Sequence, residues 1–260
     1  MRRSEVDRSK LSPMMAQYMS IKDNYEDTII FFRLGDFYEM FFDDAIIASR
    51  ELELTLTGKQ AGLEERVPMC GIPHHAYATY VDQLIEKGYK VAICEQLEDP
   101  KLTKGMVKRD VIQVVTRGTR LDDRVDAKSN NYIANIYDFN YCYGISYTDI
   151  STGEFYALVV ERDDYSVIRE VVRNGFSEVI VNDQIDRNLV NTLRTNYGVL
   201  VTITKELCEN ELYSYIYSGV EDERIIITIK HLLSYIIDTK KKELTHLQRV
   251  EAVSYTHLTL

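Results

Sequence analysis

The sequence predicts a mixed α/β protein with two domains. The chain has 260 residues, which is enough for two domains of ordinary size. Short β-branched and aromatic runs, typical of strands, alternate with segments of helical periodicity. A polar stretch at 118–130 lacks apolar periodicity and interrupts this pattern. We therefore expect a first domain at 1–117, a linker at 118–130 and a second domain at 131–252.

Helix and strand signals alternate in the first domain. Ser12 followed by Pro13 is typical of a helix start, because serine caps the first turn and proline fits inside it. The β-branched and aromatic run at 28–34 predicts a buried strand that ends at Gly35. Two glycines and mixed charges at 58–66 indicate an exposed loop. Helices are expected from Pro13 onward, at 36–49 and at 74–87, and strands at 28–34, 51–57, 67–73, 89–94 and 109–116.

Three strand-like runs open the second domain. They lie at 131–139, 141–150 and 154–160, and turn residues separate them at Asn140 and at 151–153. This spacing predicts an antiparallel meander. Helices and strands alternate beyond it, which is typical of an α/β sandwich with a mixed sheet. Helices are expected at 164–174, 186–196, 206–217 and 222–240, and strands at 177–181 and 198–203.

Composition excludes several classes of protein. Apolar residues make up 45% and charged residues 28% of the chain, which is close to the average soluble protein and unlike disordered or fibrous chains. No run approaches the ~20 apolar residues of a membrane span, and the charged N-terminus does not resemble a signal peptide. The four cysteines include no C-x-x-C pair, which favours reduced thiols over a zinc site or disulfides. We expect a cytoplasmic protein with no membrane partner and no metal site.

The segment 101–120 is basic in a chain whose net charge is −10. Charges separated by more than ~8 Å are largely screened in physiological salt, so a local excess of positive charge can attract phosphate despite the negative total. From charge alone, a solvated loop without a ligand is the simpler explanation. Against the single acidic residue Asp110, the segment has the basic residues Lys101, Lys104, Lys108, Arg109, Arg117 and Arg120.

Paired carboxylates raise the possibility of nuclease chemistry. The chain contains no G-x-x-x-x-G-K-[ST], no G-x-G-x-x-G after a strand, no H-E-x-x-H and no G-x-S-x-G. Asp149 and Glu154 flank a predicted turn, and carboxylates on neighbouring strands can hold Mg²⁺ for phosphoryl transfer. Ordinary turn chemistry is the simpler interpretation, because an aspartate before Ser-Thr-Gly is common in turns.

The aromatic segment GDFYEMFF at 35–42 is the most unusual in the chain. On extended backbone, Phe37 and Glu39 project to the same side, because side chains alternate with a period of two. The ring can then stack on a base, and the carboxylate can accept a hydrogen bond from a base edge. A second interpretation is a helix cap in which Asp36 is the N-cap and Glu39 reaches back to a free N–H group. The pattern alone favours the cap.

Several motifs occur in a fixed order along the chain. They are SPMMAQYMSIK at 12–22, FFRLGDFYEMFFDDA at 31–45, VPMCGIPHHA at 67–76, VAICEQLEDP at 91–100, VIQVVTRGT at 111–119 and DISTGEF at 149–155. Together they resemble the N-terminal part of bacterial MutS, a family of DNA mismatch recognition proteins. The similarity extends to about Val250 and so covers nearly all of the chain.

The resemblance implies a fold and a binding function. The first domain would be a mixed-sheet α/β mismatch-binding domain, and the second a connector domain with a ribonuclease H-like fold. Phe37 and Glu39 match the family's mismatch-probing positions, so the chain would bind mismatched or looped-out bases in duplex DNA. The candidates for contacts to the DNA backbone are Lys59, Lys104, Lys108 and Arg109.

The resemblance also implies cofactors and partners. ATP and Mg²⁺ would bind in an ATPase domain beyond residue 260, so no catalytic residue, cofactor or metal is expected in this chain. The connector domain would dock a MutL-like partner. Full-length members form dimers, whereas this chain is expected to be monomeric. Residues 253–260 depart from the family pattern and are expected to be foreign to the fold.

Two alternative functions remain open from the sequence. The first is a metal-dependent nuclease that uses Asp149 and Glu154. The second is a protein-interaction module in which the first domain is only a scaffold.

Overall fold

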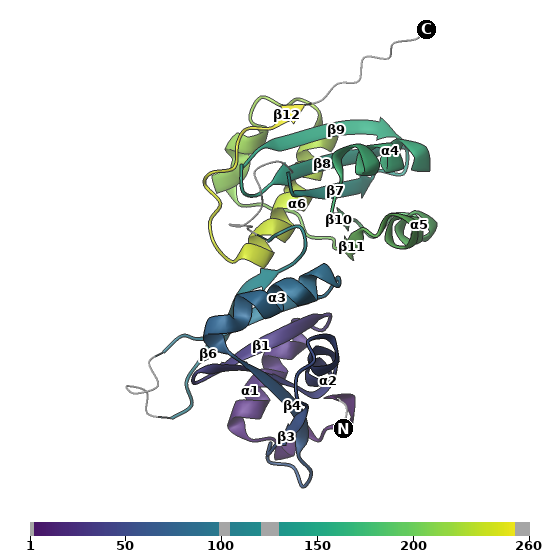
Figure 1. The fold of residues 1–260 in the computed structure, drawn as a ribbon. Coiled ribbons are helices and arrows are strands. Elements are labelled where there is room, and N and C mark those ends of the chain that lie inside the picture. Colours follow the sequence, from purple (N-terminus) through teal and green to yellow (C-terminus); the bar gives the residue numbers. More distant parts are fainter. Residues whose placement is uncertain (1–2, 99–104, 121–129, 253–260) are drawn as a thin grey trace. The chain divides into compact units, whose positions relative to one another are not determined.

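The computed structural model of the chain describes residues 3–98, 105–120 and 130–252 (Figure 1). These residues form two compact units, one up to Thr116 and one from Arg117 onward. They are called the first unit and the second unit below. Lys101, Lys104, the greater part of the predicted linker and the predicted foreign tail at 253–260 lie outside the described residues.

The first unit contains a six-stranded mixed sheet. The strand order is β3-β4-β2-β1-β5-β6, with β1 and β5 parallel and every other neighbouring pair antiparallel. The strands are β1 (Thr28–Leu34), β2 (Phe37–Phe41), β3 (Thr57–Lys59), β4 (Val67–Pro73), β5 (Lys90–Gln96) and β6 (Arg109–Val115).

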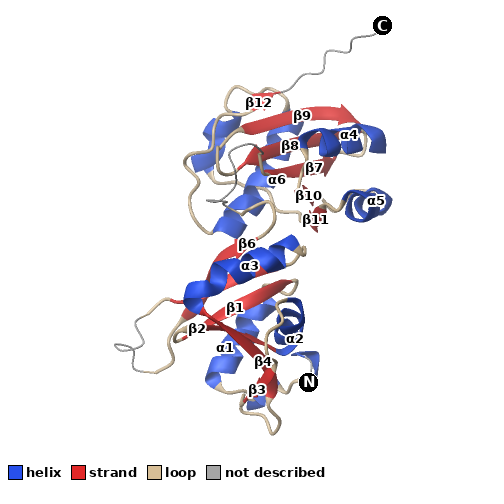
Figure 2. Cartoon of the chain, in the orientation of Figure 1, coloured by secondary structure: helices blue, strands red, loops and turns tan. Residues whose placement is uncertain are grey.

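Helices cover both faces of this sheet (Figure 2). Helix α1 (Pro13–Asp23) packs on one face, where the Tyr18 ring meets Phe41 and Phe32 edge-on at centroid distances of 5.0 and 5.5 Å. Edge-to-face contacts of this kind add about 0.5–1.5 kcal/mol beyond the burial of the rings. Helix α3 (Tyr77–Glu86) and the buried alanines of α2 (Phe42–Glu51) pack on the opposite face. Short 3₁₀ turns lie at Arg3–Glu5, Arg8–Lys10 and His74–Ala76.

The second unit contains another six-stranded mixed sheet, of order β11-β10-β7-β8-β9-β12. Strands β7, β8 and β9 form the predicted antiparallel meander. Parallel pairs join β10 to β7 and to β11, and β12 to β9. The strands are β7 (Tyr132–Asp138), β8 (Cys142–Asp149), β9 (Phe155–Glu161), β10 (Glu178–Val181), β11 (Leu200–Ile203) and β12 (Glu251–Ala252).

Three α-helices complete the second unit. Helix α6 (Glu223–Lys240) packs on one face of the sheet, and α4 (Asp164–Asn174) and α5 (Arg187–Tyr197) pack on the other. Each begins after an aspartate whose carboxylate accepts a backbone N–H, a cap that typically contributes about 1 kcal/mol. A 3₁₀ helix, η4, spans Glu211–Tyr217.

The structure differs from the sequence predictions at three elements. The predicted helix at 36–49 is strand β2 followed by α2, because Gly35 turns the chain back into a hairpin before the helix begins. The predicted strand at 51–57 is wrong, since its first residue ends α2 and only Thr57–Lys59 form a strand. The predicted α-helix at 206–217 is the shorter 3₁₀ helix η4.

The first described residues of the predicted linker pack within the second unit. The Gly118 N–H donates to Glu178 Oε2 at 3.0 Å, and the buried Lys240 ammonium donates to the Thr119 carbonyl. Both Thr119 and Glu178 are fully buried. Gly118 and Thr119 are therefore fixed parts of the second unit and not freely solvated chain.

Candidate functional site

A tight hairpin between β1 and β2 positions Phe37. Leu34 pairs with Phe37 across a two-residue turn of Gly35 and Asp36. Gly35 has φ 57° while Asp36 keeps a negative φ, as in a type II′ turn, where glycine favours the first central position. The backbone N–H of His74 donates to the Asp36 carbonyl at 2.9 Å and ties the turn to the end of β4. Phe37 therefore stands at the first position of a strand whose turn is fixed.

Strand β2 presents alternate residues to its two faces. Tyr38 and Met40 are buried in the cluster on the α3 side of the sheet. Phe37, Glu39 and Phe41 lie on the opposite face, where Phe41 is fully buried and contacts Tyr18 of α1. Phe37 lies farther along this face and remains 50% exposed. The hairpin thus presents an aromatic ring to solvent beside the turn.

Glu39 forms an ion pair with Lys59 on this face. Lys59 belongs to the edge strand β3, which β4 joins to β2. Its ammonium contacts Glu39 Oε2 and lies 5.7 Å from the centroid of the Phe41 ring. The exposed fractions are 17% for the Glu39 side chain and 29% for Lys59. Gly71 is the partner of Glu39 on β4 and has no side chain to cover the pair.

The helix-cap interpretation of Glu39 is wrong. Glu39 lies in the middle of β2, and the residue before α2 is Phe41, which makes no side-chain capping bond. The turn residue Asp36 precedes a strand and not a helix. The backbone from Phe37 to Phe41 is instead extended, which places Phe37 and Glu39 on one face of the strand.

On the α3 side of the sheet, a polar side-chain contact joins β2 to β5. This contact was not predicted from the sequence. The Tyr38 hydroxyl donates to Glu95 on β5, and Arg33 contacts the same carboxylate at 3.4 Å. Burial, reinforced by the Glu95 carboxylate, raises the pKa of Tyr38 well above its usual range, so the phenol remains a neutral donor. Tyr38 lies in the GDFYE motif and Glu95 in the CEQ motif. That both belong to family motifs is the feature of the sequence that could have pointed to this contact.

The Arg109 side chain is buried in the first unit and packs against β1. Its exposed fraction is 9%, and its guanidinium donates to the Arg33 carbonyl at 2.8 Å and to the Val107 carbonyl at 3.0 Å. The same group lies 5.1 Å from the centroid of the Phe32 ring. Burial lowers the pKa of Arg109. These contacts direct the charge of Arg109 into the unit.

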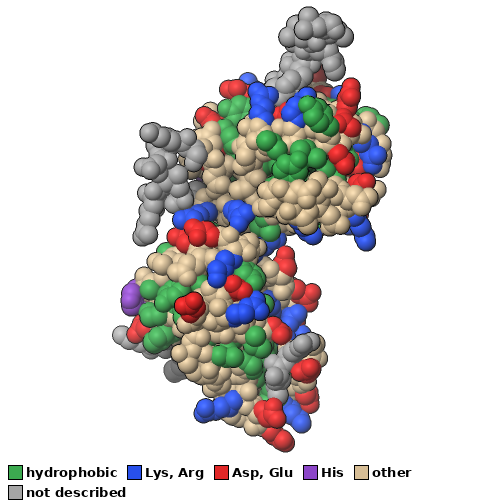
Figure 3. Space-filling view, turned by 45° about the vertical axis from the view of Figure 1, so that its right-hand side comes forward, with side chains coloured by type: hydrophobic (Ala, Val, Ile, Leu, Met, Phe, Trp, Pro, Cys, Tyr) green, Lys and Arg blue, Asp and Glu red, His purple; other side chains and the backbone are tan. Residues whose placement is uncertain are grey.

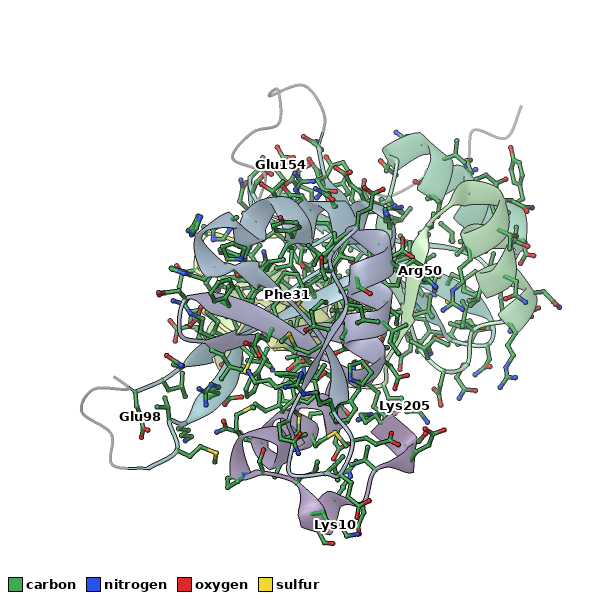
Figure 4. The ribbon with its side chains drawn as sticks, turned by 60° about the horizontal axis from the view of Figure 1, so that its bottom comes forward. Lys10, Phe31, Arg50, Glu98, Glu154 and Lys205 are labelled. Carbon is green, nitrogen blue, oxygen red and sulfur yellow. The ribbon has the colours of Figure 1, made fainter. Side chains whose placement is uncertain are left out.

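Lys108 is the exposed cation beside Arg109. Its backbone N–H donates to Glu98 Oε2 at 3.1 Å, and Figure 4 shows Glu98 on the outer loop of the first unit. On the face displayed in Figure 3, acidic and basic side chains are interspersed over each unit. On that face, positive charge comes from individual side chains and not from a broad basic surface.

Asp149 is part of a turn, as the simpler interpretation predicted. Its carboxylate accepts backbone N–H bonds from Asn131 at 2.9 Å and from Ser151 at 2.8 Å, and a hydroxyl bond from Ser151. The side chain is buried and its oxygens are occupied. Among the described residues, no three histidine, cysteine or acidic side chains gather as a metal site would require. The geometry does not favour the nuclease alternative.

Two family models match the chain in consecutive order. MutS domain I matches residues 12–124 and MutS domain II matches residues 131–248. The chain belongs to the MutS family. This confirms the resemblance that the motifs indicated and the mixed α/β class of both domains.

Several MutS relatives are similar over nearly the whole chain. The protein named DNA mismatch repair protein MutS from Listeria innocua is 45% identical over 252 residues, which is 95% of this chain and 29% of the relative. Proteins of the same name from Geobacillus sp. and Caldicellulosiruptor saccharolyticus are 45% and 42% identical. The chain thus spans less than a third of the length of these MutS relatives. No helix among the described residues is long and apolar enough to cross a membrane.

Proposed function

We propose that the chain recognises mismatched or looped-out bases in duplex DNA. One observation carries the proposal: Phe37 is half exposed on a fixed hairpin, with Glu39 on the same face of the same strand. An exposed aromatic ring beside a carboxylate suits a stack of bases whose edges carry hydrogen-bond donors. Membership of the MutS family and the names of the relatives support the same function.

Phe37 acts as the wedge. A mismatched step is weakly stacked and bends easily, so deforming it costs less than deforming a paired step. A wedge that enters the minor groove unstacks one step at a cost of a few kcal/mol. Stacking of the Phe37 ring on the displaced base recovers about 1–3 kcal/mol whichever base is present. Phe37 therefore detects a deformable step and not a particular sequence.

Glu39 discriminates against paired DNA. A carboxylate near phosphates is repelled, and its desolvation is costly unless a base donor or a shared proton satisfies it. Donors on the Watson–Crick edge of a base are free only where pairing is faulty. Glu39 therefore weakens binding to intact duplex more than binding to a mismatch, and the difference is specificity.

Cations at the edge of the unit position the DNA without reading its sequence. Lys59 and Lys108 are accessible in the structure, and Lys104 belongs to the same proposed set although it lies outside the described residues. Arg109 has its Nε and Nη1 donors engaged inside the unit. We therefore give Arg109 the role of supporting the sheet beneath the site.

Further proposals concern the longer protein to which these domains belong. We take the mismatch-binding domain as 1–117, the linker as 118–130 and the connector domain as 131–252, with Gly118 and Thr119 of the linker packed against the connector domain. The connector domain docks a MutL-like partner, and ATP and Mg²⁺ act in a separate ATPase domain. The longer protein is a dimer that works on DNA in the bacterial cytoplasm, whereas the isolated chain is monomeric.

A titration with two DNA duplexes tests the proposal. The 260-residue chain is titrated at low ionic strength into a labelled duplex with one mismatch and into its fully paired counterpart. We expect tighter binding to the mismatch, and loss of this preference in Phe37→Ala without loss of folding. Tyr165→Ala is the control, because it removes a 73% exposed ring from the second unit.

The same experiment separates the alternative functions. Absence of binding to either duplex would favour the protein-interaction module. Cleavage of the mismatched duplex that depends on Mg²⁺ would restore the nuclease alternative. A mismatch preference that persists in Phe37→Ala would show that another group is the wedge.

A further inference from the structure

The ion pair between Lys59 and Glu39 lies inside the proposed binding face. Among the described residues, Lys59 is the only cation within 4.0 Å of the Glu39 carboxylate. Side chains two positions apart on a strand are about 7 Å apart, so the pair is adjacent to the Phe37 ring. Any duplex that places a base step on Phe37 therefore brings phosphates close to both members of the pair.

A phosphate acts on the two members with opposite sign. It attracts the Lys59 ammonium and repels the Glu39 carboxylate. The pair is partly exposed, and ion pairs in such positions contribute little to stability, so it opens easily. Lysine is a point charge on a flexible four-carbon stem and can turn to another acceptor without movement of β3. Contact with a phosphate also releases a condensed counterion, which favours the new partner.

We propose that Lys59 is a specificity-determining residue that exchanges partners when DNA binds, leaving Glu39 for a phosphate. The inference rests on the proposed function of the Phe37 and Glu39 face and adds a residue to it. In the free chain, Lys59 neutralises Glu39. In the complex, the carboxylate must find a new partner, and the free Watson–Crick edge of a mispaired base supplies one, whereas that edge is occupied in a paired base. The exchange therefore adds to the cost of Glu39 on paired DNA.

A double-mutant cycle on paired DNA tests the exchange. The four proteins are the unmodified 260-residue chain, Glu39→Gln, Lys59→Gln and the double variant, all titrated at one low salt concentration. If Lys59 leaves the pair on binding, Glu39→Gln relieves both the repulsion and the cost of opening the pair. In Lys59→Gln only the repulsion remains to be relieved. We expect the tightening by Glu39→Gln to be about threefold larger when Lys59 is present, or about 0.7 kcal/mol of coupling at 1.4 kcal/mol per factor of ten.

The opposite sign would overturn the proposal. If the pair stays closed in the complex, Lys59 shields Glu39 from the phosphates, and Glu39→Gln tightens binding more when Lys59 is absent. A coupling of zero would show that the pair is irrelevant to binding, and would overturn it equally. Lys205 and Asp183 form a matched control pair in the second unit, at 2.7 Å. The cycle of Lys205→Gln and Asp183→Asn is expected to show no coupling.

The salt dependence of binding provides a second measurement. If Lys59 reaches a phosphate, Lys59→Gln lowers the slope of log affinity against log salt by about 0.9, and Lys59→Arg retains it. A slope unchanged in Lys59→Gln would contradict the exchange. Phe37→Ala in the same series distinguishes failure of the partner exchange from failure of the proposed function. If the mismatch preference depends on Phe37 but the coupling is absent, only the exchange fails; if the chain binds neither duplex, the proposed function fails with it.

Discussion

Glu39→Gln removes one negative charge from the proposed site and preserves the size of the side chain. The Glu39 side chain is 17% exposed, so the effective dielectric constant around it lies between roughly 20 near a protein surface and 80 in water. A phosphate ~6 Å away then repels the carboxylate by roughly 0.7–2.8 kcal/mol. We expect the variant to bind paired duplex about fivefold more tightly, or ~1 kcal/mol. Mismatched duplex should change less, because the lost charge-assisted hydrogen bond offsets the relieved repulsion.

The assay is a titration of both labelled duplexes, followed by fluorescence anisotropy at one fixed salt concentration. Discrimination should fall because binding to the paired duplex tightens, and not because binding to the mismatch weakens. Glu154→Gln is a matched control in the second unit and should leave both affinities unchanged. An unchanged affinity of Glu39→Gln for paired DNA would refute the placement of Glu39 against the duplex.

Three further predictions concern stability. Phe32→Ala should lower the free energy of unfolding by about 3–5 kcal/mol in urea denaturation, because the ring is fully buried; a loss below 1 kcal/mol would contradict its place in the core. Asp149→Ala should cost about 1–3 kcal/mol by the same method, because buried N–H donors lose their acceptor; a neutral effect would remove Asp149 from the turn. Burial raises the pKa of Cys94 from 9.0 to about 12, so the unfolded state loses the thiol proton first and stability falls as the pH rises above 9.0. Cys94→Ala should abolish roughly 1 kcal/mol of that loss at pH 10, and identical pH profiles for the two proteins would argue against the shift.

Local sequence signals were sufficient for many elements of the fold. The strand at 28–34 and the meander from Tyr132 to Glu161 form as their alternation and turn residues predicted. The helix predicted at 36–49 failed because Asp36 and Glu39 have the spacing of a capping box. The hairpin at Gly35 and the pairing of β2 with β4 together decide the structure there, and the second is a contact between residues some thirty positions apart. Local propensity carries no information on that contact.

The sequence was sufficient to identify the residues of the candidate site, but not the ion pair and the buried charge beside them. The aromatic and acidic residues of GDFYE were visible as an unusual group, and alternation on extended backbone placed Phe37 and Glu39 together. Lys59 was predicted as a contact for DNA, but its pairing with Glu39 depends on the strand order β3-β4-β2. Arg109 looked like an exposed member of a basic segment. Its burial follows from the carbonyls and the Phe32 ring around it, which only the folded structure brings together.

The mismatch preference of Phe37→Ala tests the central claim most directly. The quantity measured is the ratio of affinities for a mismatched and a paired duplex, in the 260-residue chain and in the variant, with the midpoint of urea unfolding recorded for both. We predict that the ratio falls to about one while the midpoint is unchanged, because Phe37 is half exposed and supports no core packing. A ratio that survives the substitution, or a variant that unfolds, would contradict the role of Phe37 as the wedge.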